Sequence, residues 1–479
     1  MLPRLWGGGH FSDIDDKSLA YLRELGVNWV WYTGVPRHSS GRPFVKGVPG
    51  SPYAVSDWYD VNPYLADHPD RRMEEYEDLI ARTHHTGLKV IMDFIPNHVA
   101  RDYGMTRSRS DIAYLGDGDD TSVHWSADND FLYYPGTAFR LPVDGEWNEM
   151  PAKATGNNYS PTPDVNDWYD TVKINYCDTY SPTWEKMYEI VRWWAAKHVD
   201  GFRCDMVDLV PPAFLKWLIA RIKNEFPDVI FIAETYRKEK YGHYISEVGF
   251  DYLYDKSGLY DSLRAIMHGH SAKMITYCWQ ELSDKQSRML NFLENHDEQR
   301  LASPFFAGKA ENGYAALSAA ALFNKAAFMV YFGQEVGESA AESGDGRTSI
   351  FDIVHPAGIS GLYEYIHSGT GLDSHALEIL STYRDILGMA SSSLVAEGLT
   401  YDLCYCNLHS PGFDPDRHFA FLRSNGRHAM LMFCNFADKA ADAEVLINEH
   451  AAGMMGVLPG IIRTHAAAYG YQLIDLKKQ

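Results

Sequence analysis

The sequence predicts an α/β fold: a (β/α)₈ TIM barrel with a loop-rich insertion and a C-terminal antiparallel β-sandwich. Short apolar runs alternate with segments of helical period about eight times, which favours a closed parallel barrel over an open sheet. The helical period disappears between residues 99 and 175, where Gly, Asp, Asn, Pro and Tyr dominate. After residue 390 the pattern changes to strands of alternating polarity.

The barrel strands are expected where β-branched and aromatic residues form short apolar runs, because a strand buried on both faces has a continuous apolar sequence. The seven clearest runs are 27–35, 89–95, 200–206, 229–234, 249–254, 290–294 and 327–332. Helices are expected between them. Met73, Tyr76 and Ile80 recur at helical spacing, and Gly87 stands where a helix end takes a left-handed residue. The same spacing recurs over 184–194 and 214–222.

These patterns divide the chain into three predicted domains. Residues 1–98 together with 176–390 form the catalytic barrel, and residues 99–175 form an inserted loop-rich domain. Residues 391–479 form a β-sandwich whose strands are clearest at 418–423 and 428–435.

Composition narrows the classes of partner. The chain has 43 Lys and Arg against 64 Asp and Glu, a formal charge of −21, so nucleic acid is not an expected partner. The longest apolar stretch, 314–323, is too short to span a bilayer, which predicts a soluble protein. No signal peptide is visible, so we expect a cytoplasmic protein, or a periplasmic or extracellular one if a leader was removed. The oligomeric state stays open.

Polar residues end four of the apolar strands, and in a barrel these strand ends carry the active site. A single Asp at a strand end is more often a helix cap or turn former than a catalyst. Several carboxylates on separate strands, with histidines beside them, instead favour function, because a carboxylate buried among apolar residues is costly unless it is paired. The residues concerned are Asp93, His98, Arg203, Asp205, Glu234, His296 and Asp297.

Four short motifs at these positions resemble those of the α-amylase family of glycoside hydrolases. They are DFIPNH at 93–98, GFRCDMVDL at 201–209, the Glu of FIAE at Glu234, and FLENHD at 292–297. The resemblance covers nearly the whole chain, since the family also has a barrel, a domain inserted after its third strand and a C-terminal β-sandwich.

The resemblance implies a retaining mechanism through a covalent glycosyl-enzyme intermediate. Asp205 matches the nucleophile, Glu234 the general acid/base, and Asp297 the carboxylate that holds the distorted sugar. Five positions are expected to bind substrate: Tyr53, Asp93, His98, Arg203 and His296. The tryptophans Trp58, Trp125, Trp147 and Trp168 are further candidates for stacking against sugar rings.

The expected activity is cleavage of α-1,4-glucosidic bonds in starch, glycogen or maltodextrins. A hydrolase of short α-glucan oligosaccharides, or a transglycosylase of the same family, is an alternative. A non-catalytic homologue that only binds glucan is a third, from another functional class. The intact set of carboxylates argues against it, because binding alone needs no acid and nucleophile.

Two departures from the family pattern affect these expectations. Many α-amylases follow the nucleophile with a Lys-His pair that contacts the leaving-group sugar, and here those positions are Asp208 and Leu209. Family members that bind calcium use an Asn at the position of Asn97, and Lys173 stands where they have a ligand Asp. No cofactor is expected for the chemistry, and a structural Ca²⁺ site is expected to be absent or altered.

Overall fold

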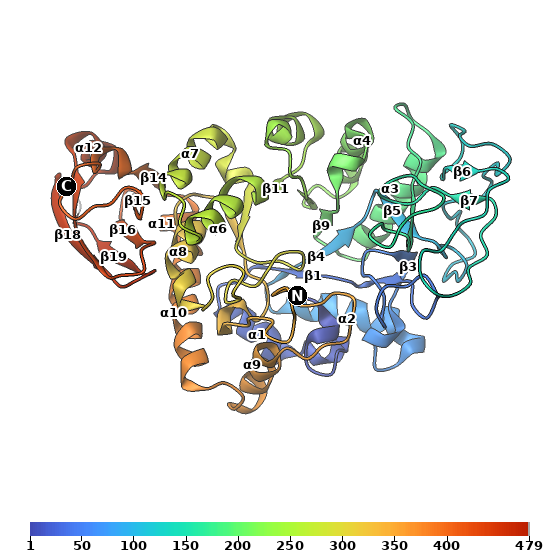
Figure 1. Ribbon diagram of the computed structural model, residues 1–479, viewed down its shortest axis with the longest axis horizontal. Coiled ribbons are helices and arrows are strands. Elements are labelled where there is room, and N and C mark those ends of the chain that lie inside the picture. The colour runs from blue at the N-terminus through green and yellow to red at the C-terminus, as the bar shows by residue number, and fades with distance from the viewer. Residues whose placement is uncertain (478–479) are drawn as a thin grey trace. The chain divides into compact units, whose positions relative to one another are not determined.

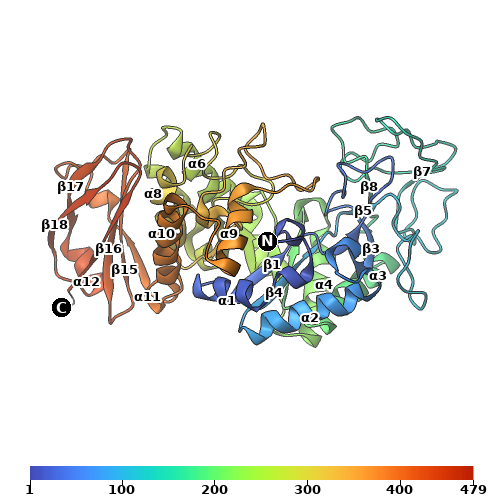
Figure 2. The same cartoon turned by 90° about the horizontal axis from the view of Figure 1, so that it is seen from below.

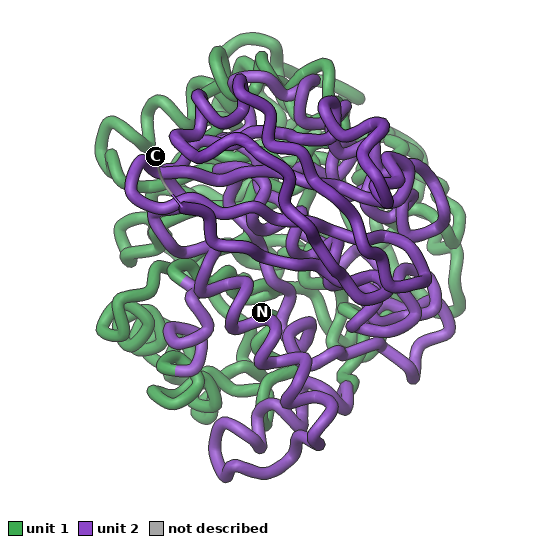
Figure 3. Tube along the Cα trace, turned by 90° about the vertical axis from the view of Figure 1, so that its left-hand side faces the viewer, with its two compact units in different colours: residues 1–20, 28–253, 349–355 green, residues 21–27, 254–348, 356–479 purple. Residues whose placement is uncertain are grey.

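The computed structural model describes residues 1–477. The chain divides into two compact units, which are coloured separately in Figure 3. Unit 1 comprises residues 1–20, 28–253 and 349–355, and unit 2 comprises residues 21–27, 254–348 and 356–479. Each unit is described by itself.

Parallel strands form the centre of unit 1. The strands β1 (Trp29–Tyr32), β4 (Lys89–Phe94), β9 (Gly201–Cys204), β10 (Ile230–Ala233) and β11 (Tyr252–Tyr254) are neighbours in this order. Each pairs in parallel with the next, as Figure 1 shows from blue to green. All five lie within the runs predicted from the sequence, and the boundary between the units falls inside β11.

Helices connect these strands, as the predicted alternation requires. They are α2 (Arg72–His85), α3 (Pro182–Ala196), α4 (Pro212–Glu225) and the short α5 (Tyr241–His243), while α1 (Asp16–Glu24) precedes β1. The α2 helix buries Tyr76, Leu79 and Ile80 and runs beside β4, as Figure 2 shows. Gly87 has a φ of +81°, which confirms the predicted left-handed helix end.

The remaining strands of unit 1 are short. β2 (Pro36–His38) pairs with β3 (Val55–Val61), β5 (His98–Ala100) with β8 (Thr171–Lys173), and β6 (Tyr133–Tyr134) with β7 (Ala152–Lys153), all antiparallel. Between β5 and β8 the chain is mostly turns and bends, in keeping with the loss of helical period there.

Unit 2 continues the parallel pattern from the end of β11. The backbone N–H of Asp255 donates to the carbonyl of Leu290, and β12 (Met289–Phe292) pairs in parallel with β13 (Ala327–Met329). The described part of the chain therefore contains seven parallel strands in chain order, where about eight were predicted. The helices of this unit before the β domain are α6 (Asp261–Met267), α7 (Lys273–Leu282), α8 (Tyr314–Leu322), α9 (Ala357–Ser368) and α10 (Ser374–Ala390).

The end of unit 2 is antiparallel, as predicted. β14 (Leu399–Asp402), β15 (His418–Ser424), β16 (Ala429–Asn435) and β19 (Tyr471–Asp475) form one sheet, and β17 (Ala441–Ile447) pairs with β18 (Gly460–Ala466). The helices α11 (Ser393–Ala396) and α12 (Glu449–Met455) accompany them. Along the described chain, every helix is too short or too polar to cross a membrane.

Candidate active site

Three charged side chains of unit 1 come together at the carboxyl ends of β9 and β10. In the register of the sheet Arg203 lies opposite Asp93 of β4 on one side and Ile232 of β10 on the other. Asp205 follows β9 directly and Glu234 follows β10 directly, and the backbone N–H of Glu234 donates to the carbonyl of Cys204. The alternation of strand side chains thus places Arg203 and Asp205 on the same face.

Arg203 links the carboxylates of this site. Its Nη1 lies 2.6 Å from Oδ1 of Asp205, and its Nη2 lies 2.8 Å from Oε1 of Glu234. The Nη1 atom is also 3.7 Å from Oδ1 of Asp93. The Arg203 side chain is 0% exposed, and those of Asp205 and Glu234 are 10% and 3% exposed. A buried cation therefore compensates carboxylates from three strands, which would otherwise be costly to bury.

Two aromatic rings flank the guanidinium. The centroid of the Tyr53 ring lies 5.4 Å from Cζ of Arg203, and that of Trp31 lies 5.3 Å away. The hydroxyl of half-buried Tyr53 donates to Oδ1 of Asp93 at 3.4 Å. The structure thus brings Tyr53, Asp93, Arg203, Asp205 and Glu234 together, as expected from the sequence.

The backbone after β9 wraps around Glu234. The N–H of Met206 donates to Oε2 of Glu234 at 2.8 Å, and the N–H of Val207 donates to the Glu234 carbonyl at 3.2 Å. Met206 has φ and ψ of +46°, a left-handed conformation that is strained for a residue with a Cβ. In this conformation the backbone N–H of Met206 faces the Glu234 carboxylate.

His98 belongs to a second buried group of unit 1. Its Nδ1 lies 3.0 Å from the amide nitrogen of Asn97, and its ring packs 5.1 Å from that of Trp168. The ring also hydrogen-bonds the backbone of Tyr53. Burial, followed by the nearby charge of Lys173, lowers the pKa of His98 to about 3, so its ring is neutral at physiological pH.

Lys173 occupies the surroundings of Asn97. Its ammonium donates to Oδ1 of Asn97 and, at 2.9 Å, to the carbonyl of Leu209. Burial lowers the pKa of Lys173 to about 7. An amide oxygen and a carbonyl that would suit Ca²⁺ therefore face an ammonium group.

The remaining predicted pair lies in unit 2. Nε2 of buried His296 is 3.1 Å from Oδ2 of Asp297, whose side chain is 42% exposed. The Asn295 side chain accepts the backbone N–H groups of Asp297 and Glu298, and Arg347 donates to the Asp297 carbonyl at 2.7 Å. These bonds fix the turn that follows β12.

The four tryptophan candidates differ in exposure. Trp58 is 1% exposed and packs near Phe94, so its expected role as a stacking platform is wrong: the ring has no face open to a sugar. Trp147 packs against Phe44, and Trp168 lies against His98. Trp125 is 56% exposed.

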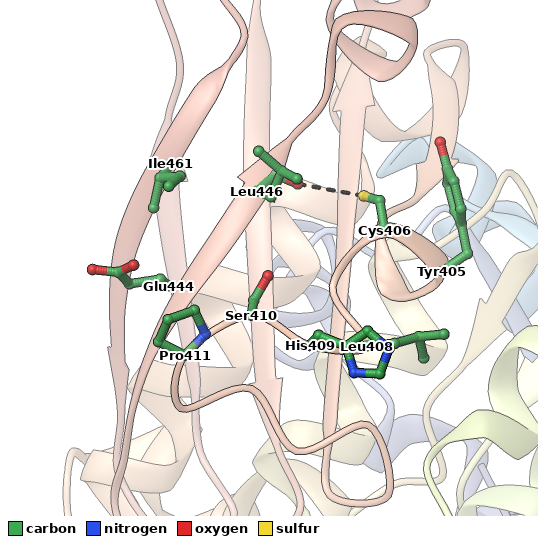
Figure 4. A pocket seen from close by; sticks show the side chains of 9 residues that line it. All are labelled: Tyr405, Cys406, Leu408, His409, Ser410, Pro411, Glu444, Leu446 and Ile461. Carbon is green, nitrogen blue, oxygen red and sulfur yellow. Dashed lines mark hydrogen bonds between the residues drawn. The ribbon is translucent and has the colours of Figure 1, made fainter.

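A separate pocket of about 350 Å³ lies in the C-terminal β domain (Figure 4). Its lining spans residues 405–461, with Tyr405, His409 and Glu444 as its larger polar side chains. It contains none of the residues predicted to act on substrate. Its chemistry therefore does not bear on the carboxylate site.

Three residues near the site, Tyr236, Asp208 and Trp31, were not assigned a role from the sequence. Tyr236 hydrogen-bonds Glu234, and Asp208 hydrogen-bonds the segment that carries Tyr236. The one available signal was that Asp208 stands where the family has a lysine. Trp31 was also missed, although alternation within its strand gives it a defined face.

Comparisons with known proteins agree with this fold. The model of the alpha amylase catalytic domain matches residues 7–377. Alpha-amylase 3 of Dictyoglomus thermophilum is 24% identical over 349 residues, covering 69% of this chain and 60% of that protein. An alpha-1,4-glucan:maltose-1-phosphate maltosyltransferase of Cereibacter sphaeroides is 26% identical over 273 residues, covering 53% of this chain and 38% of that protein.

The chain thus spans about 38% to 60% of the length of these two curated relatives. Among solved structures, a maltogenic alpha-amylase of Thermotoga neapolitana aligns with a TM-score of 0.65 at 19% identity, covering 99% of this chain and 94% of that one. That likeness bears on the fold alone. The family assignment rests on the domain match, which extends over well more than half of the sequence. The chain belongs to the alpha-amylase family.

Proposed function

We propose that the protein is a retaining glycoside hydrolase that cleaves α-1,4-glucosidic bonds in starch, glycogen or maltodextrins. The observation that carries the proposal is the buried Arg203, whose two terminal nitrogens contact Asp205 and Glu234. A guanidinium fork holds two carboxylates side by side. Retaining glycosidases need their two carboxyl groups about 5 Å apart.

In this mechanism Asp205 is the nucleophile. Its carboxylate attacks the anomeric carbon while Glu234 gives a proton to the glycosidic oxygen, whose bond to that carbon breaks. Glu234, now ionised, then takes a proton from water, and the resulting hydroxide displaces Asp205 from the anomeric carbon. Arg203 keeps Asp205 ionised and oriented through a charge-assisted hydrogen bond. Asp297 is the third carboxylate, which holds the distorted sugar.

The residues expected to bind substrate have the following roles in this proposal. Tyr53 supplies a ring for the sugar that is cleaved, and its bond to Asp93 orients it. The neutral ring of His98 and the ring of His296 hydrogen-bond sugar hydroxyls. A neutral polymer also suits an acidic protein, since it carries no phosphates to repel.

No cofactor is needed for this chemistry, and a calcium site at Asn97 does not fit the residues present. The Lys173 ammonium donates to the two oxygens that would face the ion, so bound Ca²⁺ would oppose a positive charge. We infer that Lys173 takes over the structural role of the ion.

The test is release of sugar from soluble starch by the whole chain and by Asp205→Asn. The wild type should release reducing ends whose initial anomer is α, and the variant should lose nearly all activity while its circular dichroism is unchanged. Retained activity in the variant would exclude Asp205 as the nucleophile. A wild type that binds starch but releases no sugar would support the non-catalytic alternative.

Products from maltoheptaose separate the two catalytic alternatives. A hydrolase gives only shorter chains, whereas a transglycosylase also gives chains longer than seven glucose units. This measurement is needed because Asp208 and Leu209 replace the Lys-His pair on the leaving-group side. In transglycosylation the acceptor sugar binds on that same side.

A further inference from the structure

The segment after β10 folds back over Glu234. Tyr236, two residues further along, donates its hydroxyl to Oε1 of Glu234 at 2.7 Å. Arg203 shares this oxygen, and Oε2 accepts the backbone N–H of Met206. One of the two carboxylate oxygens is therefore held by a side chain that is 40% exposed and lies outside the strand.

Asp208 fastens the segment that carries Tyr236. Its Oδ2 accepts the Thr235 hydroxyl at 3.0 Å and the backbone N–H of Tyr236 at 3.1 Å. Its Oδ1 accepts the hydroxyl of fully buried Tyr244 at 3.0 Å and lies 3.8 Å from Nζ of Lys240. Four groups thus surround the Asp208 carboxylate, whose side chain is 10% exposed. They belong to Thr235, Tyr236, Lys240 and Tyr244.

A lysine at position 208, as in the family pattern, could not do this. It has three donors and no acceptor, so it could not accept the hydrogen bonds that the Thr235 hydroxyl, the Tyr236 N–H and the Tyr244 hydroxyl donate to Asp208. It would also face Lys240, a like charge. The observed conformation of residues 235–244 therefore depends on an acidic side chain at position 208.

We propose that Asp208 and Tyr236 are positioning residues that orient Glu234 towards the leaving-group oxygen. This inference rests on the acid/base role proposed above for Glu234. A tyrosine hydroxyl both donates and accepts, whereas the Met206 N–H and the Arg203 guanidinium only donate. The Tyr236 contact therefore persists when Glu234 carries its proton and when it has passed that proton to the departing sugar.

The charged groups around Glu234 act on it either by direct contact or through a neighbouring residue. Arg203 contacts it directly, and Asp205 and Asp93 reach it through Arg203. Asp208 and Lys240 act through the 235–244 segment. Loss of the Tyr236 hydroxyl removes one donor to the ionised form of Glu234, which favours the protonated form.

The experiment compares Tyr236→Phe and Asp208→Asn on two substrates, maltoheptaose and 4-nitrophenyl α-maltoside. The nitrophenolate leaves with little help from an acid, so its kcat/KM for the first step depends weakly on the orientation of Glu234. Each variant should lose about tenfold in kcat/KM on maltoheptaose, mainly in kcat, the value of about one charge-assisted hydrogen bond. The loss on the nitrophenyl substrate should stay below about threefold.

Two further readouts distinguish positioning from a general loss of structure. The alkaline limb of the kcat/KM profile should move up by about 0.5 to 1 pH unit in Tyr236→Phe, because ionised Glu234 is less stabilised. The double variant should be no worse than the poorer single variant, since both act through the same contact. Tyr277→Phe, on a 63% exposed tyrosine of α7, is the matched control and should match the wild type.

Equal losses on both substrates, an unshifted alkaline limb or additive effects would each overturn the inference. A wild type that cleaves maltoheptaose while Tyr236→Phe cleaves it equally well would overturn this inference and leave the proposed function standing. A wild type without activity on maltoheptaose and starch would remove the proposed function itself.

Discussion

Replacing Arg203 by lysine tests the link between Asp205 and Glu234, the carboxylates proposed as nucleophile and acid/base. Arginine contacts Asp205 and Glu234 through different nitrogens, at 2.6 and 2.8 Å. Lysine keeps the charge, but its single shorter-reaching ammonium satisfies one of the two carboxylates. One hydrogen bond between charged groups is therefore lost, about 1.5 to 3 kcal/mol. If the freed carboxylate leaves its productive orientation, kcat/KM falls by about 10- to 150-fold.

The assay measures initial rates of reducing-sugar release over a range of starch concentrations, with urea unfolding in parallel. Arg423→Lys is the matched control, because Arg423, in β15 of the C-terminal β domain, is equally buried and donates to the carbonyls of Phe323 and Gly398. The control should lose stability but keep its kcat/KM. The reasoning is refuted if Arg203→Lys stays within about threefold of the wild type, or if both variants lose activity alike.

Three other changes are predicted. Tyr53→Ala should raise KM for maltooligosaccharides about 5- to 10-fold with a smaller effect on kcat, whereas Tyr53→Phe keeps the ring and most of the affinity; an unchanged KM in Tyr53→Ala would place the ring outside the binding site. Exhaustive dialysis against a chelator should leave the melting temperature of the wild type within about 2 °C of the untreated protein. Elemental analysis that finds about one Ca²⁺ retained per chain would contradict the inferred role of Lys173. Burial raises the pKa of Glu294 from 4.5 to about 7. Because the folded state then holds a proton that the unfolded state releases, the free energy of unfolding should fall as pH rises from 4.5 to 7, by up to about 1.4 kcal/mol per unit. Glu294→Gln should flatten this dependence in urea titrations at several pH values, and an identical pH slope in the variant would contradict it.

The barrel strands were predictable because burial on both faces leaves a strong local signal. The runs at 89–95, 200–206 and 229–234 contain β4, β9 and β10, and the strands end one or two residues earlier than the runs. Just past these strand ends, the backbone N–H groups of Asp205 and Glu234 still donate to the neighbouring strands, at the carbonyls of Phe94 and Cys204, while their side chains meet Arg203. The polar residues that close two of these apolar runs, Asp205 and Glu234, thus come together at Arg203.

The contacts outside the strands were not predictable to the same degree. The bond from Tyr236 to Glu234 depends on how residues 235–244 fold, which in turn depends on Asp208 in the segment after another strand. No local pattern encodes that pairing. The solvent exposure of the tryptophans could not be predicted from the sequence either. Trp58 is fully buried and Trp125 is exposed, although both are the same residue type.

An aspartate at position 208, where the family pattern has a lysine, alters more than one contact, because it reverses a charge beside the segment that follows Glu234. An aspartate in place of the family's lysine changes the charge at position 208 by two units. Lys240 of the 235–244 segment supplies one positive charge, and its Nζ lies 3.8 Å from Oδ1 of Asp208. The positive charge that the family presents to the leaving sugar is thereby moved to a segment that also carries the partner of Glu234. In the proposed mechanism, orientation of Glu234 and recognition of the leaving sugar then depend on the same ten residues, 235–244. It follows that changes in this segment should alter kcat and product pattern together, whereas changes at Tyr53 should affect mainly KM.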